Sequence, residues 1–305
     1  MLAVNAPDIQ DLRYPVMVSP KLDGVRCLIR NNEPVTRSLD PVVNRFVHQA
    51  LSRPELEGLD GELILGSPTS PTVFRDSSAA VRREEGEPHM TYYVFDHVTD
   101  GPPLKSVDDF QNRFWFAGTI VDAMRSKLPN VDLVLVPHLM VQTPAELSKL
   151  EEQWVSEGYE GLMVRDPSGP YKFGRSTANE GWLLKVKRFV DTEGVVIGTT
   201  ELMRNNNPKE TNRLGLSERA GLAEHLVPGG VLGALMVRSA AFPETFEIGT
   251  GFLAEERQDL WNRRELLIGQ TVTFKYQAVG VLDRPRFPVY KGFRSLADMD
   301  RGGEE

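Results

Sequence analysis

The chain has 305 residues, 40% of them hydrophobic, which is enough for two domains that each bury a core. Its 35 basic and 43 acidic side chains give a formal net charge of −8, which excludes a protein that coats nucleic acid through bulk positive charge but allows a local basic groove. A single cysteine, Cys27, excludes a disulfide framework and a cysteine-based zinc site. With no long apolar run and no leader-like start, we expect a cytoplasmic protein without a membrane segment.

The first predicted elements are two short strands, residues 14–19 and 25–30, on either side of the sequence KLDGVR at 21–26. Asp23 and Gly24 form a common turn pair, so the pattern predicts a hairpin that presents Lys21 to a pocket. A lysine amine is a nucleophile only when cationic neighbours or burial favour its neutral form. The motif therefore suggests covalent phosphoryl chemistry, although a surface lysine before an Asp-Gly turn is also common without any function.

Further strands and helices are predicted up to residue 157. The patterns predict strands at 58–65, 90–96 and 131–136 and helices at 43–51, 106–128 and 143–157. Asp60 and Glu62 lie on one face of their strand, where two carboxylates can bind a sugar hydroxyl or Mg²⁺. Phe95 can stack on a purine or simply fill the core. These elements predict an α+β domain built on antiparallel sheets.

A basic segment ends this domain. Within residues 165–188 the cations outnumber the acids Asp166 and Glu180, and they are Arg165, Lys172, Arg175, Lys185, Lys187 and Arg188. Lys185 and Lys187 fall on one strand face, where like charges repel unless an anion such as a phosphate lies between them. The same two lysines favour the neutral, nucleophilic form of Lys21.

The pattern changes near residues 188–190, so we predict domains at 1–188 and 189–305. The second part contains predicted strands at 194–202, 231–239, 246–249 and 271–279 and a helix at 254–264. This content suits a small Greek-key barrel of the OB-fold type. Residues 203–230 form a polar insertion too long for an ordinary connection, which is therefore either disordered or functional. A cationic cluster at 284–294 is either a second anion site or a solvated tail.

Six motifs together resemble a known superfamily. The sequences KLDGVR, DGE, YVFD, EGLMVR, LLKVK and RFPVYKGFR occur in the order and approximate spacing of the covalent nucleotidyltransferases. The chain most resembles an ATP-dependent DNA ligase of the minimal chlorella virus type, including GRST at 174–177 and IGTGF at 248–252. The resemblance implies an antiparallel-sheet, ATP-grasp-like adenylation domain followed by an OB-fold β-barrel.

The resemblance also implies an activity, the sealing of nicks with a 3′-hydroxyl and a 5′-phosphate in duplex DNA. Lys21 matches the nucleophile that forms a lysyl-AMP from ATP, and the AMP then passes to the DNA 5′-phosphate before the 3′-hydroxyl attacks. Glu62 matches a ribose contact, Arg26 a nucleotide and phosphate contact, and Phe95 the ring stacked on adenine. Asp23 aligns with an acid near the 3′-hydroxyl of the nick.

Phosphate, metal and DNA contacts follow from the same comparison. Lys185 and Lys187 match a pair on the α-phosphate, Glu160 matches a ligand of Mg²⁺ or Mn²⁺, and Asp60 is a second metal candidate. Arg37 and Arg175 match cations at the phosphates of the nick. Arg204, Arg213 and Arg219 lie in the segment that matches a latch-like hairpin around the DNA. Arg286, Lys291 and Arg294 match the motif that orients the pyrophosphate leaving group.

Domain motion and clamping are further implications. The OB domain would close over ATP and then swing to grip DNA, with a monomer closed as a clamp around the nicked duplex. The insertion has a balanced charge, however, because its cations Arg204, Lys209, Arg213 and Arg219 are offset by Glu201, Glu210, Glu218 and Glu224. We therefore expect a weaker phosphate grip than that of a basic latch.

Several alternatives share parts of this pattern. An mRNA capping guanylyltransferase and an RNA ligase have related motifs, and EGLMVR favours a ligase over the capping enzyme. An NAD-dependent ligase is disfavoured because its zinc module needs four cysteines. A catalytically dead DNA-binding scaffold is disfavoured by the intact Lys21, Glu62 and Glu160. Roles in DNA replication, repair or recombination all remain compatible with the sequence.

Overall fold

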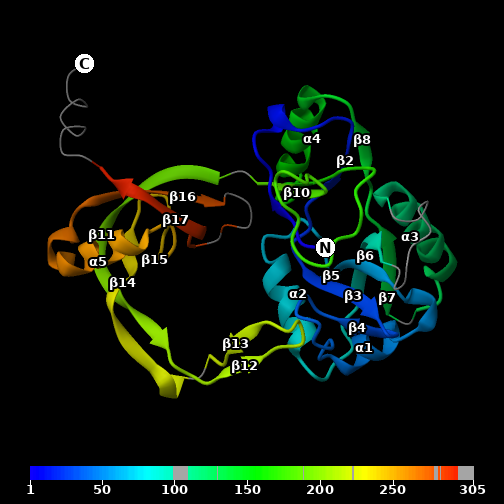
Figure 1. Ribbon diagram of the computed structural model, residues 1–305, viewed down its shortest axis with the longest axis horizontal. Helices are drawn as coiled ribbons and strands as arrows, with labels where there is room; N and C mark the ends of the chain where they lie inside the picture. The colour runs from blue at the N-terminus through cyan, green and yellow to red at the C-terminus, as the bar shows by residue number, and fades with distance from the viewer. Residues whose placement is uncertain are drawn as a thin grey trace. The chain divides into compact units, whose positions relative to one another are not determined.

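The computed structural model describes residues 1–98, 109–128, 130–187, 189–221, 223–277, 281 and 283–294. The chain divides into two compact units, Met1–Lys187 and Arg188–Glu305, and each is described by itself (Figure 1). The limits expected from the sequence, 1–188 and 189–305, lie one residue later than this division. Within the described residues, no helix is both long and apolar enough to cross a membrane.

The first sheet of the first unit has the strand order β1-β10-β9-β2-β8. Its strands are β1 (Val4–Asn5), β2 (Val16–Pro20), β8 (Leu139–Val141), β9 (Leu162–Arg165) and β10 (Leu183–Val186). All neighbours are antiparallel except β1 and β10. Helix α4 (Pro144–Ser156) begins where the Thr143 side chain accepts a hydrogen bond from the Glu146 backbone. Its buried Leu147 and Trp154 join the apolar core of this sheet, as expected from the sequence.

The second sheet of this unit has the order β4-β3-β5-β6-β7. Its strands are β3 (Val25–Arg30), β4 (Glu33–Val35), β5 (Leu59–Leu65), β6 (Met90–His97) and β7 (Val131–Leu135). The helices around it are α1 (Arg45–Leu51), α2 (Val73–Arg82) and α3 (Phe110–Met124), with short 3₁₀ turns at Ile9–Asp11 and Pro54–Leu56. The core between sheet and helices is almost completely apolar and includes the fully buried Cys27.

Strands β2 and β3 lie in different sheets, so the predicted hairpin around Lys21 is wrong. The segment between them crosses from one sheet to the other instead. Gly24 is needed there for a close approach, because a Cβ atom would lie 2.5 Å from the Leu63 carbonyl oxygen and 2.9 Å from Cγ of Glu62. Since Gly24 does not have a positive φ angle, its value lies in packing against β5 rather than in turn formation.

The other predicted elements of this unit are present with shifted ends. The long helix expected at 106–128 is α3, whose observed limits are Phe110–Met124, and residues 106–108 lie outside the described part. Helix α2 was not predicted, because its sequence is rich in polar and small residues. Its buried Ser77 accepts a hydrogen bond from the Leu65 backbone at 2.9 Å, which attaches the helix to β5.

The second unit is built on one five-stranded sheet with the order β15-β14-β11-β16-β17. The strands are β11 (Phe189–Asn205), β14 (Leu226–Arg238), β15 (Phe246–Ile248), β16 (Thr271–Gln277) and β17 (Arg286–Phe293). Helix α5 (Ala254–Asn262) and a 3₁₀ turn (Arg264–Leu267) cover a core rich in aromatic rings. The cationic cluster at 284–294 is therefore mostly a strand and not a solvated tail. The end of the strand predicted at 271–279 lies outside the described residues.

The expected β-barrel is not closed. All neighbours in this sheet are antiparallel, and among the described residues the edge strands β15 and β17 come together only near an isolated parallel bridge between Thr250 and Val289. The architecture is OB-like, but the barrel seam lacks a continuous ladder. Closure depends on pairing between distant segments, which short-range strand patterns do not specify.

The described residues of the insertion at 203–230 form a hairpin. Strands β11 and β14 remain paired as far as Asn205 and Leu226, and beyond them β12 (Lys209–Thr211) pairs with β13 (Ser217–Arg219). The side chain of Asn205 links the two arms by donating to the Ala220 carbonyl at 2.8 Å. A 3₁₀ turn (Ala223–His225) leads back to β14. Figure 1 shows this hairpin leaving the sheet of the second unit.

Candidate active site

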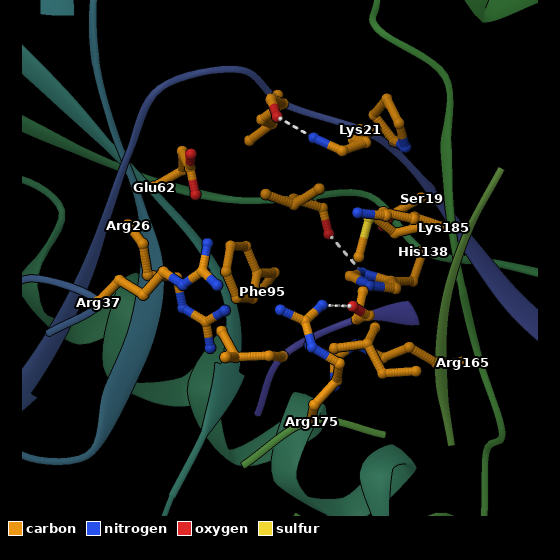
Figure 2. Close-up of a pocket in the computed structure, with 17 residues that line it drawn as sticks. Ser19, Lys21, Arg26, Arg37, Glu62, Phe95, His138, Arg165, Arg175 and Lys185 are labelled. Atoms are coloured by element: carbon orange, nitrogen blue, oxygen red, sulfur yellow. Dashed lines mark hydrogen bonds between the residues drawn. The ribbon is translucent and has the colours of Figure 1, made fainter. Parts of the chain in front are cut away.

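A cavity of about 220 Å³ lies in the first unit and receives side chains from both of its sheets (Figure 2). Predicted site residues that line it are Lys21, Arg26, Arg37, Glu62, Phe95, Arg175 and Lys185. The crossing segment after β2 explains this meeting, because it carries Lys21 from the first sheet to the edge of the second. The structure thus brings together residues that lie more than 160 positions apart in the sequence.

Lys21 is held against Glu160. Its backbone N–H donates to the Gly161 carbonyl at 2.8 Å, and its ammonium group forms an ion pair with Oε2 of Glu160. The other oxygen, Oε1, pairs with Lys187. Gly161 is required here, because its φ is +148° and a Cβ atom would lie 2.1 Å from the Val186 carbonyl oxygen. The start of β9 is therefore pressed against the end of β10.

The carboxylate of Glu160 is almost fully buried, with 2% of its side chain exposed. Burial raises the pKa of Glu160, but Lys21 and Lys187 outweigh this effect and hold the pKa at about 2. The sequence predicted an anion such as a phosphate between Lys185 and Lys187. The structure instead has the Glu160 carboxylate between Lys187 and Lys21. Lys185 faces the cavity instead, and burial together with Lys187, Lys21 and Arg175 lowers its pKa.

Asp60 and Glu62 occupy different environments although they share a strand. Both oxygens of the buried Asp60 are occupied, since Arg26 donates to Oδ1 at 2.6 Å and also pairs with Oδ2, which accepts from the Tyr171 hydroxyl at 2.8 Å. This geometry gives no support to Asp60 as a metal ligand. It instead fixes the Arg26 guanidinium group, which lies 5.2 Å from the centre of the Phe95 ring.

Glu62 faces the cavity and accepts a hydrogen bond from the Gly24 backbone at 3.1 Å. Burial raises its pKa to about 7, despite the opposing effects of Lys21 and Arg26. Close to neutral pH this side chain can therefore donate or accept a hydrogen bond. Such a group suits contact with a hydroxyl.

A buried ionic network beside Phe95 received no role in the sequence analysis. Asp96 is fully buried and accepts from Arg113 at 2.9 Å and from Arg165 at 2.6 Å. Burial would raise the pKa of Asp96, but Arg165 and Arg113 hold it at about 2. The Arg165 guanidinium also lies 4.3 Å from the Phe110 ring centre and 5.8 Å from that of Phe95. The network joins β6, α3 and β9. The one indication of it in the sequence was a charged residue at the end of an apolar strand.

Two exposed arginines lie at the edge of the cavity. Arg37 follows β4 in a turn, and Arg175 donates to the Ala3 carbonyl at 2.7 Å. Leu2 and Ala3 line the same cavity, which no sequence pattern indicated. Asp23 is partly buried and follows Lys21 on the crossing segment, but it is not among the described residues that line the cavity.

With this geometry established, comparison with known proteins identifies the family. Residues 1–187 match the family described as ATP dependent DNA ligase domain, and residues 227–294 match the DNA ligase OB-like domain. The chain belongs to the ATP-dependent DNA ligase family. The resemblance inferred from the six motifs is confirmed, and the capping and RNA ligase alternatives are not favoured.

Individual relatives agree with this assignment. The chain is similar to a "Probable DNA ligase" of Kineococcus radiotolerans, 29% identical over 175 residues, and to a DNA ligase of African swine fever virus, 27% identical over 143 residues. These matches cover 53% and 47% of this chain but only 32% of each relative, so the chain spans about a third of their length.

Solved structures extend the similarity to both units. Chlorella virus DNA ligase-adenylate is 31% identical, with a TM-score of 0.54, and the match covers 96% of this chain and 98% of that one. A Lig E DNA ligase, 24% identical with the same coverage and a TM-score of 0.70, shares the fold.

In the second unit, the cations assigned to the pyrophosphate are Arg286 and Lys291 on β17 and Arg294, which directly follows the strand. Lys291 donates to Asp191 at 2.5 Å and Arg294 to Glu193 at 2.9 Å, and all four side chains are exposed. Arg286 is partly buried at the start of the same strand. On the hairpin, Arg204, Lys209, Arg213 and Arg219 are all exposed.

Proposed function

We propose that this protein seals nicks in duplex DNA with ATP, through a covalent lysyl-AMP on Lys21 and a 5′-5′ AMP–DNA intermediate. The observation that carries the proposal is the position of Lys21. Its amine lies at a cavity with Glu62, Phe95 and Lys185, next to a buried carboxylate that a second lysine also holds. Family membership gives the class of reaction, and this cavity supplies groups suited to it.

The cavity has a base end and a phosphate end. Phe95 lies with the apolar side chains of Val136, Met163 and Leu183, which suits a flat purine ring. The cationic lining of Lys21, Arg37, Arg175 and Lys185 suits the triphosphate. In this arrangement Phe95 would stack on adenine, and Glu62 would contact a ribose hydroxyl.

In the first step the Lys21 amine attacks the α-phosphorus, a nitrogen–phosphorus bond forms and pyrophosphate leaves. The ion pair with Glu160 holds Lys21 as an ammonium group, so Lys21 must lose a proton before it attacks. Glu160 keeps Lys187 as a partner throughout, which allows it to release Lys21 without becoming an isolated buried charge. Lys185 would then stabilise the charge on the α-phosphate.

A divalent cation fits this donor set. Mg²⁺ is often held by one or two carboxylates, with phosphates and waters completing its shell. Glu160 would be its protein ligand through Oε2, which becomes available once Lys21 is released. The described residues contain no cluster of three or more acids, histidines or cysteines that would suggest an all-protein cage. When bound, Mg²⁺ or Mn²⁺ would neutralise charge on the transferring phosphate.

The later steps need the DNA ends beside the same lysine. The exposed Arg37 and Arg175 would bind phosphates of the nick, and Asp23 would lie near the 3′-hydroxyl. Arg26, held by Asp60, would contact nucleotide and phosphate. The AMP would pass to the 5′-phosphate, and the 3′-hydroxyl would then attack and release AMP.

The second unit would serve both nucleotide and DNA. Arg286, Lys291 and Arg294 would orient pyrophosphate in the first step. Exposed ion pairs are weak, so Lys291 and Arg294 can exchange Asp191 and Glu193 for phosphate at little cost. The hairpin with Arg204, Arg213 and Arg219 would complete a clamp around the nicked duplex, formed by a single chain.

Transfer of label from ATP tests this function. Incubation with α-labelled ATP should give a protein that keeps the label on a denaturing gel, and addition of nicked duplex DNA should move the label to DNA and then release it with sealing. Parallel incubation with GTP tests the capping alternative, and a nicked RNA duplex tests the RNA ligase alternative. Absence of protein labelling by ATP would overturn the proposal.

A further inference from the structure

His138 lines the cavity together with Phe95 and was not selected from the sequence (Figure 2). Its Nδ1 atom is 3.0 Å from the Val136 carbonyl oxygen. A carbonyl oxygen only accepts hydrogen bonds, so Nδ1 must carry the hydrogen. The ring also packs against Phe114 and Phe110, with ring centres 4.5 and 5.2 Å away. The orientation of the imidazole is therefore held by three separate contacts.

The second ring nitrogen is an acceptor. Burial, together with the nearby Arg165, lowers the pKa of His138 to about 3, so the ring is neutral at physiological pH. With hydrogen on Nδ1, Nε2 carries a lone pair. Nε2 is buried, and among the described residues it has no hydrogen-bond partner. A buried acceptor without a partner is uncommon in native proteins, and ligand sites are one of the places where it occurs.

Neighbouring donors do not satisfy this nitrogen. Arg165 is the closest cationic group that affects the ring, and it donates to Asp96 at 2.6 Å. Arg165 also connects the ring to the expected base position, because its guanidinium lies against both Phe110 and Phe95. Phe110 in turn packs on His138. His138 and Phe95 both line the cavity, so the imidazole lies in the pocket proposed for the base.

We propose that Nε2 of His138 accepts a hydrogen bond from the exocyclic amine of adenine and thereby rejects guanine. Adenine carries an amine at position 6, which donates, whereas guanine carries a carbonyl oxygen there, which would face a second acceptor. Because Nε2 is shielded from solvent, the lining side chains must move slightly as the ring enters. The inference rests on the proposed use of ATP and names the residue that reads the base.

Nucleotide analogues test the contact without any mutation. Purine riboside triphosphate has hydrogen in place of the 6-amine, and inosine triphosphate has a carbonyl at the same position. For the wild-type protein, formation of the covalent nucleotide at low nucleotide concentration should fall about five- to tenfold with the first analogue. It should fall about 10- to 100-fold with the second, because two acceptors then oppose each other. Equal rates with ATP and purine riboside triphosphate would overturn the proposal.

Two substitutions separate the role of Nε2 as a hydrogen-bond acceptor from the role of Nδ1 in holding the ring. In His138→Asn the amide can keep the hydrogen bond to Val136 but has no atom at the position of Nε2. In His138→Gln the longer side chain can place its amide oxygen near that position. We expect His138→Asn to use ATP and purine riboside triphosphate equally and to lose about tenfold of its discrimination against inosine triphosphate. His138→Gln should retain the preference for ATP.

The two proposals fail in different ways. If the wild-type protein forms no covalent adenylate, the proposed function is wrong, and base preference is then measured by the thermal shift that each triphosphate produces. If the adenylate forms but the ATP preference is unchanged in His138→Asn, the role of His138 is wrong and the function stands. Thermal unfolding of each variant without nucleotide shows whether the fold is intact, and the analogue series on the wild-type protein decides the matter if a variant does not fold.

Discussion

Charged side chains are used in opposite ways in the two units. Around the cavity of the first unit, Asp96 is fully buried and shared by two arginines. In the second unit, Lys291 on β17 and Asp191 on β11 are 45% and 54% exposed, and they form an ion pair with each other. Buried pairs hold a fixed geometry and are costly to break, whereas exposed pairs are weak and exchange readily. The comparison suggests a rigid nucleotide pocket in one unit and replaceable phosphate contacts in the other.

The largest expected effect tests the centre of the rigid region. Lys21→Ala should abolish covalent attachment of labelled AMP, because no other amine has this position. Lys21→Arg should fail equally, since a guanidinium remains protonated and does not attack. The melting temperature should change little, because Glu160 keeps its ion pair with Lys187. Retention of label by either variant, detected on a denaturing gel, would show that another residue is the nucleophile.

A second prediction compares a buried and an exposed carboxylate directly. Asp96→Asn should destabilise the protein by about 3–5 kcal/mol, because Arg113 and Arg165 would remain buried without their shared anion. The matched control, Glu193→Gln, removes the exposed partner of Arg294 and should cost less than about 1 kcal/mol. Denaturant unfolding near pH 7 measures both.

Acid should reduce the difference in the free energy of unfolding between Asp96→Asn and the wild-type protein. The pKa of Asp96 is held at about 2, below its ordinary value of 3.8, so its stabilisation is complete above pH 3.8 and is lost as the pH falls through 2. If Asp96→Asn and Glu193→Gln reduced the free energy of unfolding equally near pH 7, the division into rigid and exchangeable charges would be wrong.

The pH dependence of Glu62 is a third test. Its pKa is raised from 4.5 to about 7, so the folded state binds a proton more tightly than the unfolded state. Between pH 4.5 and 7 this group therefore reduces stability as the pH rises, and the full cost is present above pH 7. Glu62→Gln should be more stable than the wild type by up to about 3 kcal/mol above pH 7, with no such charge-related gain below pH 4.5. If the difference in stability between Glu62→Gln and the wild type, measured without ligand, does not change with pH, burial does not raise the pKa of Glu62 in this way.

The smallest expected effect concerns the hairpin. Replacement of residues 206–225 by a short Gly-Ser linker keeps the last β11–β14 pair, Asn205 and Leu226. Covalent adenylation of Lys21 should remain near normal, and affinity for nicked DNA should fall about tenfold as one side of the grip is lost. Since the charges of the segment balance, the wild type and the deletion should show similar salt dependence.

Nick binding at two salt concentrations measures this effect. If the deletion binds nicked DNA as tightly as the wild type, the hairpin is not part of a clamp. If it loses affinity with a much shallower salt slope, the hairpin contributes through net charge after all, and the balanced-charge argument is wrong.

Much of the architecture followed from local patterns. The helix at 143–157 was predicted from its Thr143-Pro144 start and the Gly158 stop, and the strands at 25–30 and 58–65 from β-branched and apolar runs. Such features depend on neighbouring residues, which the sequence displays directly. The side chains of the site were not selected from local patterns of this kind. They were selected because six short motifs in a fixed order resembled a known superfamily.

Pairing over long distances was not available from these patterns. An Asp-Gly pair suits a hairpin and also suits a crossing between sheets, so only the packing of Gly24 on β5 distinguishes them. Asp60 appeared to be a metal ligand because a carboxylate on a strand has no visible partner in the sequence. Arg26 lies 34 residues away, and Tyr171 lies 111 residues away.

The sequence by itself therefore determined the family and most of the order of the elements, and it selected Lys21 as the candidate nucleophile, since these depend on local composition and motif order. The tertiary structure alone decided the partners of the charged groups. Glu160 lies between Lys21 and Lys187, and His138 keeps an unpaired acceptor beside the cavity. Burial and distance set the strength of every such interaction, and both arise only when remote segments pack together.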